Sequence, residues 1–203
     1  MGLTASEGGD FKSAPVGSHI ARCIGVIDLG TQHEEYQGEK KTAHKVLLKW
    51  ELPGTLMDDG RPFVVSKFYT LSLHEKSALR KDLQAWRAKN FAADELKAFD
   101  LKMLLGKVCM VAVVDKPTGN GTKVAGVMAA PKGVPVPPSE AALVSFDIDS
   151  WDVGVYESLS DGLKKIIQES DEARRRNGSR KGVDPSADDD AGYDAGADSE
   201  IPF

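Results

Sequence analysis

Apolar and polar residues alternate along one segment of the chain. From residue 45 to residue 52 this alternation predicts a strand with one buried face, whose apolar members are Val46, Leu48, Trp50 and Leu52. Pro53 and Gly54 follow and predict the end of this strand. Two more strands are predicted over residues 17–29, where Gly25 indicates a bend or bulge, and over residues 61–71. The polar segment 31–42 predicts a long hairpin loop.

The hydrophobic period changes after the third predicted strand. Ser72 to Glu75 matches a capping box, and Leu79, Leu83 and Trp86 recur at helical spacing, so a helix is predicted here. A second short helix is predicted at about residues 93–99. Strand patterns return over residues 107–114 and 122–129, and the Pro- and Gly-containing segment between them predicts a turn.

This order of three strands, a helical insertion and two strands favours a mainly β (α+β) fold. It is the order of an OB-fold, a five-stranded Greek-key barrel with a helix between the third and fourth strands. A generic α+β sheet is the alternative. The predicted organisation is a flexible N-terminal arm over 1–14, the OB domain over 15–130, a proline-containing strap over 131–150, a C-terminal helix over 151–172 and a disordered basic-then-acidic tail over 173–203.

The predicted C-terminal helix carries apolar residues at helical spacing. Leu159, Leu163, Ile166 and Ile167 form this apolar set. They predict either packing against a neighbouring element or an oligomer contact.

Charge divides the chain into two parts. The formal net charge is −5, but seven acidic residues and no Lys or Arg follow Lys181. Subtracting these seven from the 31 acidic residues leaves 24, against 26 basic residues. A mildly basic body with an acidic tail suits a phosphate-binding domain whose tail competes for the same groove. A neutral domain with a solvating tail fits the charges equally well.

Cysteine content and hydropathy indicate an intracellular protein. Cys23 and Cys109 are far apart in the sequence and form no Cys-x-x-Cys pair, so neither a disulfide framework nor a zinc site is indicated. The N-terminus lacks the pattern of a secretory signal, and no segment approaches membrane-spanning length. We expect a cytoplasmic location.

Aromatic and basic residues are interleaved along the first three predicted strands. OB-folds bind single strands by stacking bases on aromatic rings within a positively charged groove. The candidate DNA-binding residues are Tyr36, Lys40, Lys41, Lys45, Lys49, Trp50, Arg61, Lys67 and Tyr69. The parity of Trp50 favours a core position, whereas Lys67 and Tyr69 are the better candidates for the binding face. Phe68 fits the core or the surface.

The sequence offers little for catalysis. Four histidines, at 19, 33, 44 and 74, are scattered without metal-ligand spacing. Asp147, Asp149 and Asp152 could form the Mg²⁺ site of a nuclease, but their place before a predicted helix favours helix capping. The chain has no phosphate-binding loop of a nucleotide hydrolase. We expect no enzymatic activity, cofactor or metal.

The C-terminal tip is the most specific motif. Asp198, Glu200, Ile201, Pro202 and Phe203 place an apolar end and the α-carboxylate after an acidic run. This tip resembles the C-terminus of bacterial single-stranded DNA-binding proteins. Residues 67–73 and 104–108 are more similar to phage-encoded single-stranded DNA-binding proteins. The helical insertion departs from the bacterial pattern, which puts the tetramer of that family in doubt.

The resemblance implies a function and a set of partners. The body would coat single-stranded DNA without sequence specificity during replication, recombination or repair in a bacterial host. The tip would recruit replication or repair proteins of the host or the phage. The alternative is an OB-fold adaptor of a replication complex, in which the domain binds a protein instead of DNA.

Overall fold

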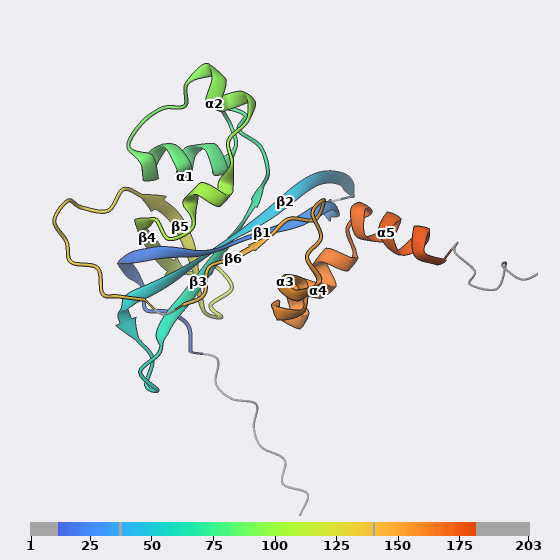
Figure 1. The fold of residues 1–203 in the computed structure, drawn as a ribbon. Coiled ribbons are helices and arrows are strands. Elements are labelled where there is room, and N and C mark those ends of the chain that lie inside the picture. The colour runs from blue at the N-terminus through green and yellow to red at the C-terminus, as the bar shows by residue number, and fades with distance from the viewer. Residues whose placement is uncertain (1–11, 37, 140, 182–203) are drawn as a thin grey trace, which may run out of the picture.

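The computed structural model describes residues 12–36, 38–139 and 141–181 and is mainly β, with a six-stranded sheet and several helices (Figure 1). Five strands follow the order β3-β2-β1-β4-β5, and each is antiparallel to its neighbours. They are β1 (Gly17–Tyr36), β2 (Glu39–Leu56), β3 (Pro62–Thr70), β4 (Val108–Asp115) and β5 (Thr122–Met128). A short strand, β6 (Val144–Phe146), pairs in parallel with the middle of β1.

The helices form two groups. Between β3 and β4 lie α1 (Ala78–Arg87), α2 (Ala93–Lys97) and the 3₁₀ helix η1 (Leu101–Leu104), and after β6 come α3 (Val153–Ser158), α4 (Asp161–Gln168) and α5 (Asp171–Lys181). Figure 1 shows the first group over one side of the sheet, and the second packs against the middle of β1, where the β1–β2 hairpin begins. Among the described helices, none combines the length and apolar character needed to span a bilayer.

Two hydrophobic clusters share β1. Val26 belongs to the larger cluster, between the sheet and α1, whereas the next residue, Ile27, belongs to a smaller cluster under the C-terminal helices. Successive side chains of a strand point to opposite faces, so β1 serves both clusters at once. The smaller cluster is completed by Leu29, Leu47, Phe146, Ile148, Tyr156, Leu159 and Ile167.

Several sequence predictions are confirmed. The alternating apolar residues of β2 are buried in the larger cluster, and Trp50 is fully buried there. The predicted helical set of Leu79, Leu83 and Trp86 forms the buried face of α1. Register between β1 and β2 shifts at Gly25, where a bulge was expected. The apolar residues of the C-terminal helices pack against β1, which agrees with the predicted packing against a neighbouring element.

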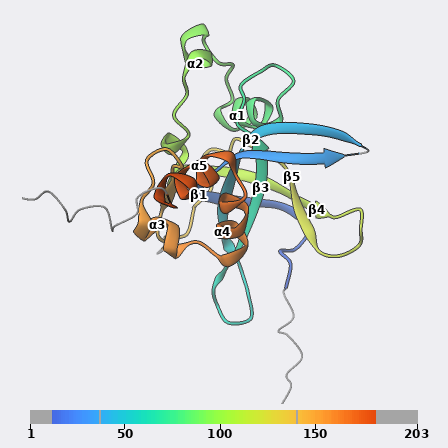
Figure 2. The ribbon, with the colours of Figure 1, turned by 90° about the vertical axis from the view of Figure 1, so that its right-hand side faces the viewer.

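The predicted hairpin loop is wrong. Residues 31–42 continue β1 and β2 as a two-stranded ribbon that extends past the other strands (Figure 2). Glu34 and Glu35 lie opposite Lys41 and Lys40, and such opposite charges stabilise a pair of polar strands. The predicted stop at residues 53–54 is also wrong, because β2 continues through an irregularity in its pairing with β3.

The predicted capping box does not start α1. The hydroxyl of Ser72 accepts a hydrogen bond from the amide of His74, at 3.2 Å, within a turn. The helix begins later, at Ala78, with Ser77 as its N-cap. The side chain of Ser77 makes no capping hydrogen bond.

The predicted single C-terminal helix is three helices. Asp152 caps α3 by accepting a hydrogen bond from the amide of Val155 at 2.9 Å, as expected for a capping role. Ser160 is the N-cap of α4, and the hydroxyl of Ser170 accepts from the amide of Ala173 in the first turn of α5. The predicted strap contains β6, and α5 includes residues that were assigned to the tail.

Histidine and carboxylate groups join α5 to the hairpin. Glu172 accepts hydrogen bonds from the amide of Thr31 at 2.8 Å and from its hydroxyl at 2.7 Å. His44 shares a 2.6 Å hydrogen bond with Asp28, which raises the pKa of the imidazole against the opposing effect of burial. Glu172 and Asp149 add attraction for the protonated form.

The free energy of unfolding should therefore fall as pH rises above about 6.5. The pKa of His44 is higher in the folded state than its ordinary value of about 6.5 in the unfolded chain. The stabilisation from protonated His44 is therefore complete below about pH 6.5. This contribution is lost as pH rises through the folded pKa. Urea unfolding across this range should show the decline in the wild type and a weaker decline in His44→Gln. An identical decline in both would exclude His44 as its source.

Candidate nucleic-acid interface

A long groove lies between the two edge strands of the five-strand order. The ammonium group of Lys67 on β3 donates a 2.9 Å hydrogen bond to the carbonyl of Ala125 on β5, so these edges approach each other. Beside this contact the groove has a volume of about 1100 Å³. It is lined by residues 12–14, by residues 64–68 of β3 and by the β4–β5 hairpin.

The groove is positively charged. Four lysines and no acidic residue are among its lining residues. Lys12 pairs with Asp58, and Lys67 pairs with Asp82 at 2.7 Å. In the described part of the chain no acidic group pairs with the other two, Lys116 and Lys123. Their ammonium groups can therefore meet an anion without breaking an ion pair.

Phe68 is the exposed aromatic ring of the groove. This residue is 53 % exposed, although it lies within β3. Phe63 and Tyr69 are buried, whereas Val64 and Phe68 are exposed. Phe68 also lines two neighbouring hollows of about 480 and 400 Å³. One face of this ring is thus accessible where three concave surfaces meet.

The 480 Å³ hollow lies at the start of α1, and we call it the α1 pocket. Lys45 and Lys76 provide positive charge, and Ser72, Ser77 and Thr70 provide hydroxyl groups. Phe68, Tyr69, His74 and Ala78 complete its lining. As in the groove, none of these residues is acidic.

Two aromatic candidates from the sequence are core residues. Trp50 is fully buried and packs against Trp86, with 6.2 Å between ring centroids. Tyr69 is 3 % exposed, and its hydroxyl donates a 2.7 Å hydrogen bond to Asp82. Burial and this bond raise the pKa of Tyr69 far above its usual range, so the hydroxyl stays neutral. Neither ring has a face available for a base, which corrects the assignment of Tyr69 to the binding face.

Lys67 occupies a structural position. Its ammonium group donates to Asp82 and to the carbonyl of Ala125, and it lies 5.1 Å from the centre of the Tyr69 ring. These partners hold β3 to α1 and β5. Lys67 therefore contributes positive charge to the groove wall while its hydrogen bonds are used within the protein.

The other basic candidates are distributed along the molecule. Lys45 lines the α1 pocket and pairs with Glu34 at 3.0 Å. Lys49 is half-buried against Gly25 and faces the C-terminal helices. Arg61 is exposed and pairs with Asp59. The structure thus gathers Lys45 and Lys67 near Phe68 and places Lys49 elsewhere.

The hairpin candidates lie at the far end of β1 and β2. Lys40 and Lys41 are exposed there, and Lys41 pairs with Glu39 at 3.6 Å. Tyr36 is the last residue of β1 at the same turn. The partner-binding candidates at 198–203 lie outside the described residues.

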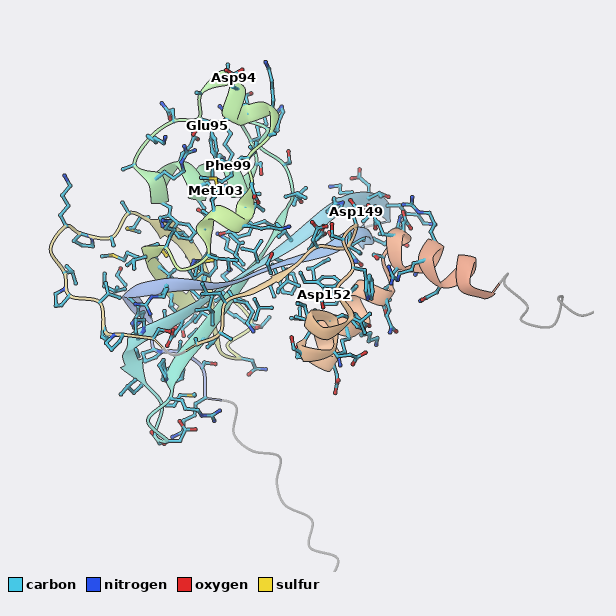
Figure 3. The ribbon with its side chains drawn as sticks, viewed as in Figure 1. Asp94, Glu95, Phe99, Met103, Asp149 and Asp152 are labelled. Carbon is cyan, nitrogen blue, oxygen red and sulfur yellow. The ribbon has the colours of Figure 1, made fainter. Side chains whose placement is uncertain are left out.

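The three aspartates near the C-terminal helices do not form a metal site. The carboxylate of Asp147 accepts hydrogen bonds from Lys102 and from two backbone amides, and Asp152 caps α3. Figure 3 shows Asp149 near the β1–β2 hairpin, apart from Asp152. Over the described residues there is no group of three or more His, Cys, Asp and Glu that could hold a metal ion.

Sequence reasoning did not single out Phe68, the exposed ring of the groove among the described residues, or several of the lysines. Phe68 and Tyr69 are adjacent aromatic residues of one strand, so they lie on opposite faces. The sequence does not show which of the two faces is buried. Lys116 and Lys123 flank the Gly-rich turn between β4 and β5, and this position was an available signal. Lys76 lies in the turn that was mistaken for helix.

Comparison with known proteins adds no family assignment. No protein family model matches the chain, and no curated protein sequence is significantly similar to it. Its function must therefore be inferred from the geometry and charge of the groove.

Proposed function

We propose that this protein binds single-stranded DNA without sequence preference, in the groove between β3 and β5. The observation that carries this proposal is the exposed ring of Phe68 within a groove lined by lysines and no acidic residue. Bases of any sequence can stack on an aromatic face, and lysines neutralise the phosphates that connect them. Both requirements of sequence-tolerant binding thus meet on one surface.

We further propose that the body is an OB-fold. The strand order β3-β2-β1-β4-β5 supports this interpretation, because the Lys67–Ala125 hydrogen bond brings β3 and β5 together at the open side. The insertion of α1 between β3 and β4 agrees with the same topology. In OB-folds, the second and third strands and the loop between the fourth and fifth bind oligonucleotides. In this proposal Phe68 on β3, Lys116 in the β4–β5 turn and Lys123 at the start of β5 would have these roles.

The acidic C-terminus has a separate role in this proposal. The tip Ile201-Pro202-Phe203 and its α-carboxylate would dock on a replication or repair protein, of host or phage origin, as its resemblance to bacterial single-stranded DNA-binding proteins suggests. The acidic run before it would compete with DNA for the lysines of the groove. The groove and the tip would thus hold DNA and recruit partners independently.

Titration of the full chain with labelled nucleic acids tests the proposal. We expect anisotropy to report tight binding of an oligothymidine of about 16 nucleotides, the upper site size of one OB domain, and weaker binding of duplex of equal length. If Lys76, Lys116 and Lys123 each contact one phosphate, the affinity should fall with salt at a log–log slope of about −2. A chain that ends at Glu200 should bind DNA equally well.

Two results would contradict DNA binding in the groove. The first is no binding of oligothymidine at low salt, and the second is equal affinity for duplex. Either would favour the adaptor alternative, in which the groove holds a protein segment. An oligouridine of matched length in the same titration establishes the preference between DNA and RNA.

A further inference from the structure

The α1 pocket has the electrostatic character of an anion site. The N-terminus of a helix carries a partial positive charge, and natural helices usually place acidic residues in the first turn. The first turn of α1 contains no acidic residue. Instead, Lys76 precedes the helix, and Arg80 and Lys81 follow within it. The nearby acidic residues, Glu75 before the helix and Asp82 in its second turn, do not line the α1 pocket.

A hydroxyl group in this pocket lacks a partner. Ser77 occupies the N-cap position, but its side chain makes no capping hydrogen bond. Its oxygen is buried and has no hydrogen-bond partner among the described residues. A buried hydroxyl without a partner costs free energy unless a ligand supplies one. The hydroxyl can gain a partner when the Ser77 side chain turns toward a hydrogen-bond acceptor bound in the α1 pocket.

We propose that the α1 pocket binds one phosphate group of the DNA backbone. The ligating groups are the ammonium of Lys76, the hydroxyl of Ser77 and the first free amides of α1. This assignment rests on the proposed function, because Phe68 lines both the groove and the pocket. A base stacked on Phe68 would have a neighbouring phosphate within reach of this pocket. The α1 pocket therefore anchors the strand as it leaves the groove.

Ser77→Asp tests this assignment because stability and affinity should change in opposite directions. Aspartate is a favourable N-cap and complements the helix dipole, so the melting temperature should rise by about 2–4 °C. The same carboxylate would repel a phosphate in the pocket, and affinity for oligothymidine should fall about tenfold. An affinity equal to that of the wild type, with the expected rise in melting temperature, would overturn the proposal.

Lys76→Ala and Lys81→Ala form a matched pair. Both variants remove one positive charge near the start of α1, but Lys81 does not line the α1 pocket. Lys76→Ala should reduce the magnitude of the salt slope by about 0.7, the value for one single-strand phosphate contact, and Lys81→Ala should leave it unchanged. Equal changes in both variants would indicate general electrostatic attraction and refute a specific site.

Amide chemical shifts separate the sources of the phosphate. Oligothymidine should shift the amides of Ala78, Leu79 and Arg80 in the wild type but not in Ser77→Asp. Shifts produced equally by millimolar inorganic phosphate would identify a free anion site and overturn the assignment to the DNA backbone. If the wild type does not bind oligothymidine at all, the proposed function fails. Wild-type binding without these amide shifts refutes the phosphate site alone.

Discussion

Phe68→Ala should weaken oligothymidine binding about tenfold or more without loss of the fold. Stacking of a base on an aromatic ring contributes about 1–3 kcal/mol, and Phe68 is the exposed ring among the described residues of the groove. Because its side chain lies largely outside the hydrophobic clusters, truncation should leave the melting temperature nearly unchanged. Anisotropy titration and thermal unfolding of the same samples measure both quantities.

Two further variants define the effect of Phe68. Phe68→Trp should keep or increase the affinity, because a larger ring presents more stacking surface. Met103→Ala truncates another exposed apolar side chain, in η1 on the α1–α2 side of the sheet (Figure 3), and should leave DNA binding unchanged. Equal affinities for Phe68→Ala and the wild type would remove the main support for DNA binding in the groove.

Asp82→Ala should lower the free energy of unfolding by about 3 kcal/mol. Its carboxylate accepts from the ammonium of Lys67 and from the hydroxyl of Tyr69, both at 2.7 Å. Removal leaves a largely buried cation and a buried hydroxyl short of a partner, and breaking such pairs is costly. Chemical denaturation of the variant and the wild type provides the measurement.

An exposed ion pair is the control for this prediction. Asp94 and Lys97 are paired at 3.2 Å with both side chains largely in solvent. Asp94→Ala should therefore change stability by less than about 0.5 kcal/mol. Asp82→Asn keeps a hydrogen-bond acceptor and should lose less than Asp82→Ala. If Asp82→Ala is as mild as Asp94→Ala, Asp82 does not hold β3 to α1.

This network changes how DNA-binding variants must be chosen. From sequence alone, Lys67 and Tyr69 are the natural pair to mutate. In the structure both support the sheet, so their replacement would reduce binding through loss of structure. Lys116 and Lys123 line the groove without these structural contacts and are the informative positions.

Local patterns predicted β1 to β5 and most of the larger hydrophobic cluster, but not β6. The alternation at residues 45–52 identified the face of β2 that packs in the larger cluster, whereas Leu47 on the opposite face is buried in the smaller one. The helical spacing of Leu79, Leu83 and Trp86 identified the buried face of α1. In both segments the residues that share one periodicity pack in the larger cluster, so the pattern alone identified that face. The OB-fold itself stays a prediction.

The binding face depended on long-range contacts. Tyr69 and Lys67 have the appearance of surface residues until Asp82, on α1, supplies the partner that permits their burial. Because Tyr69 then faces the core, the adjacent Phe68 faces the opposite side of β3 and is exposed. Likewise, the polar segment 31–42 is part of two paired strands, because α5 accepts a backbone hydrogen bond from it and opposite charges face each other across the pair. Asp82 and Glu172 lie outside the strands whose patterns were read, whereas the Glu–Lys pairs of the hairpin are close in sequence and were an available signal.

The sharing of β1 by two hydrophobic clusters limits how this protein can change in length. Val26 and Ile27 are adjacent, yet they face opposite clusters. Insertion or deletion of one residue here would exchange the two faces and bury each side chain on the wrong side. Substitutions of similar size can be accommodated in this stretch, whereas changes of length must accumulate elsewhere, such as the β2–β3 and β4–β5 turns.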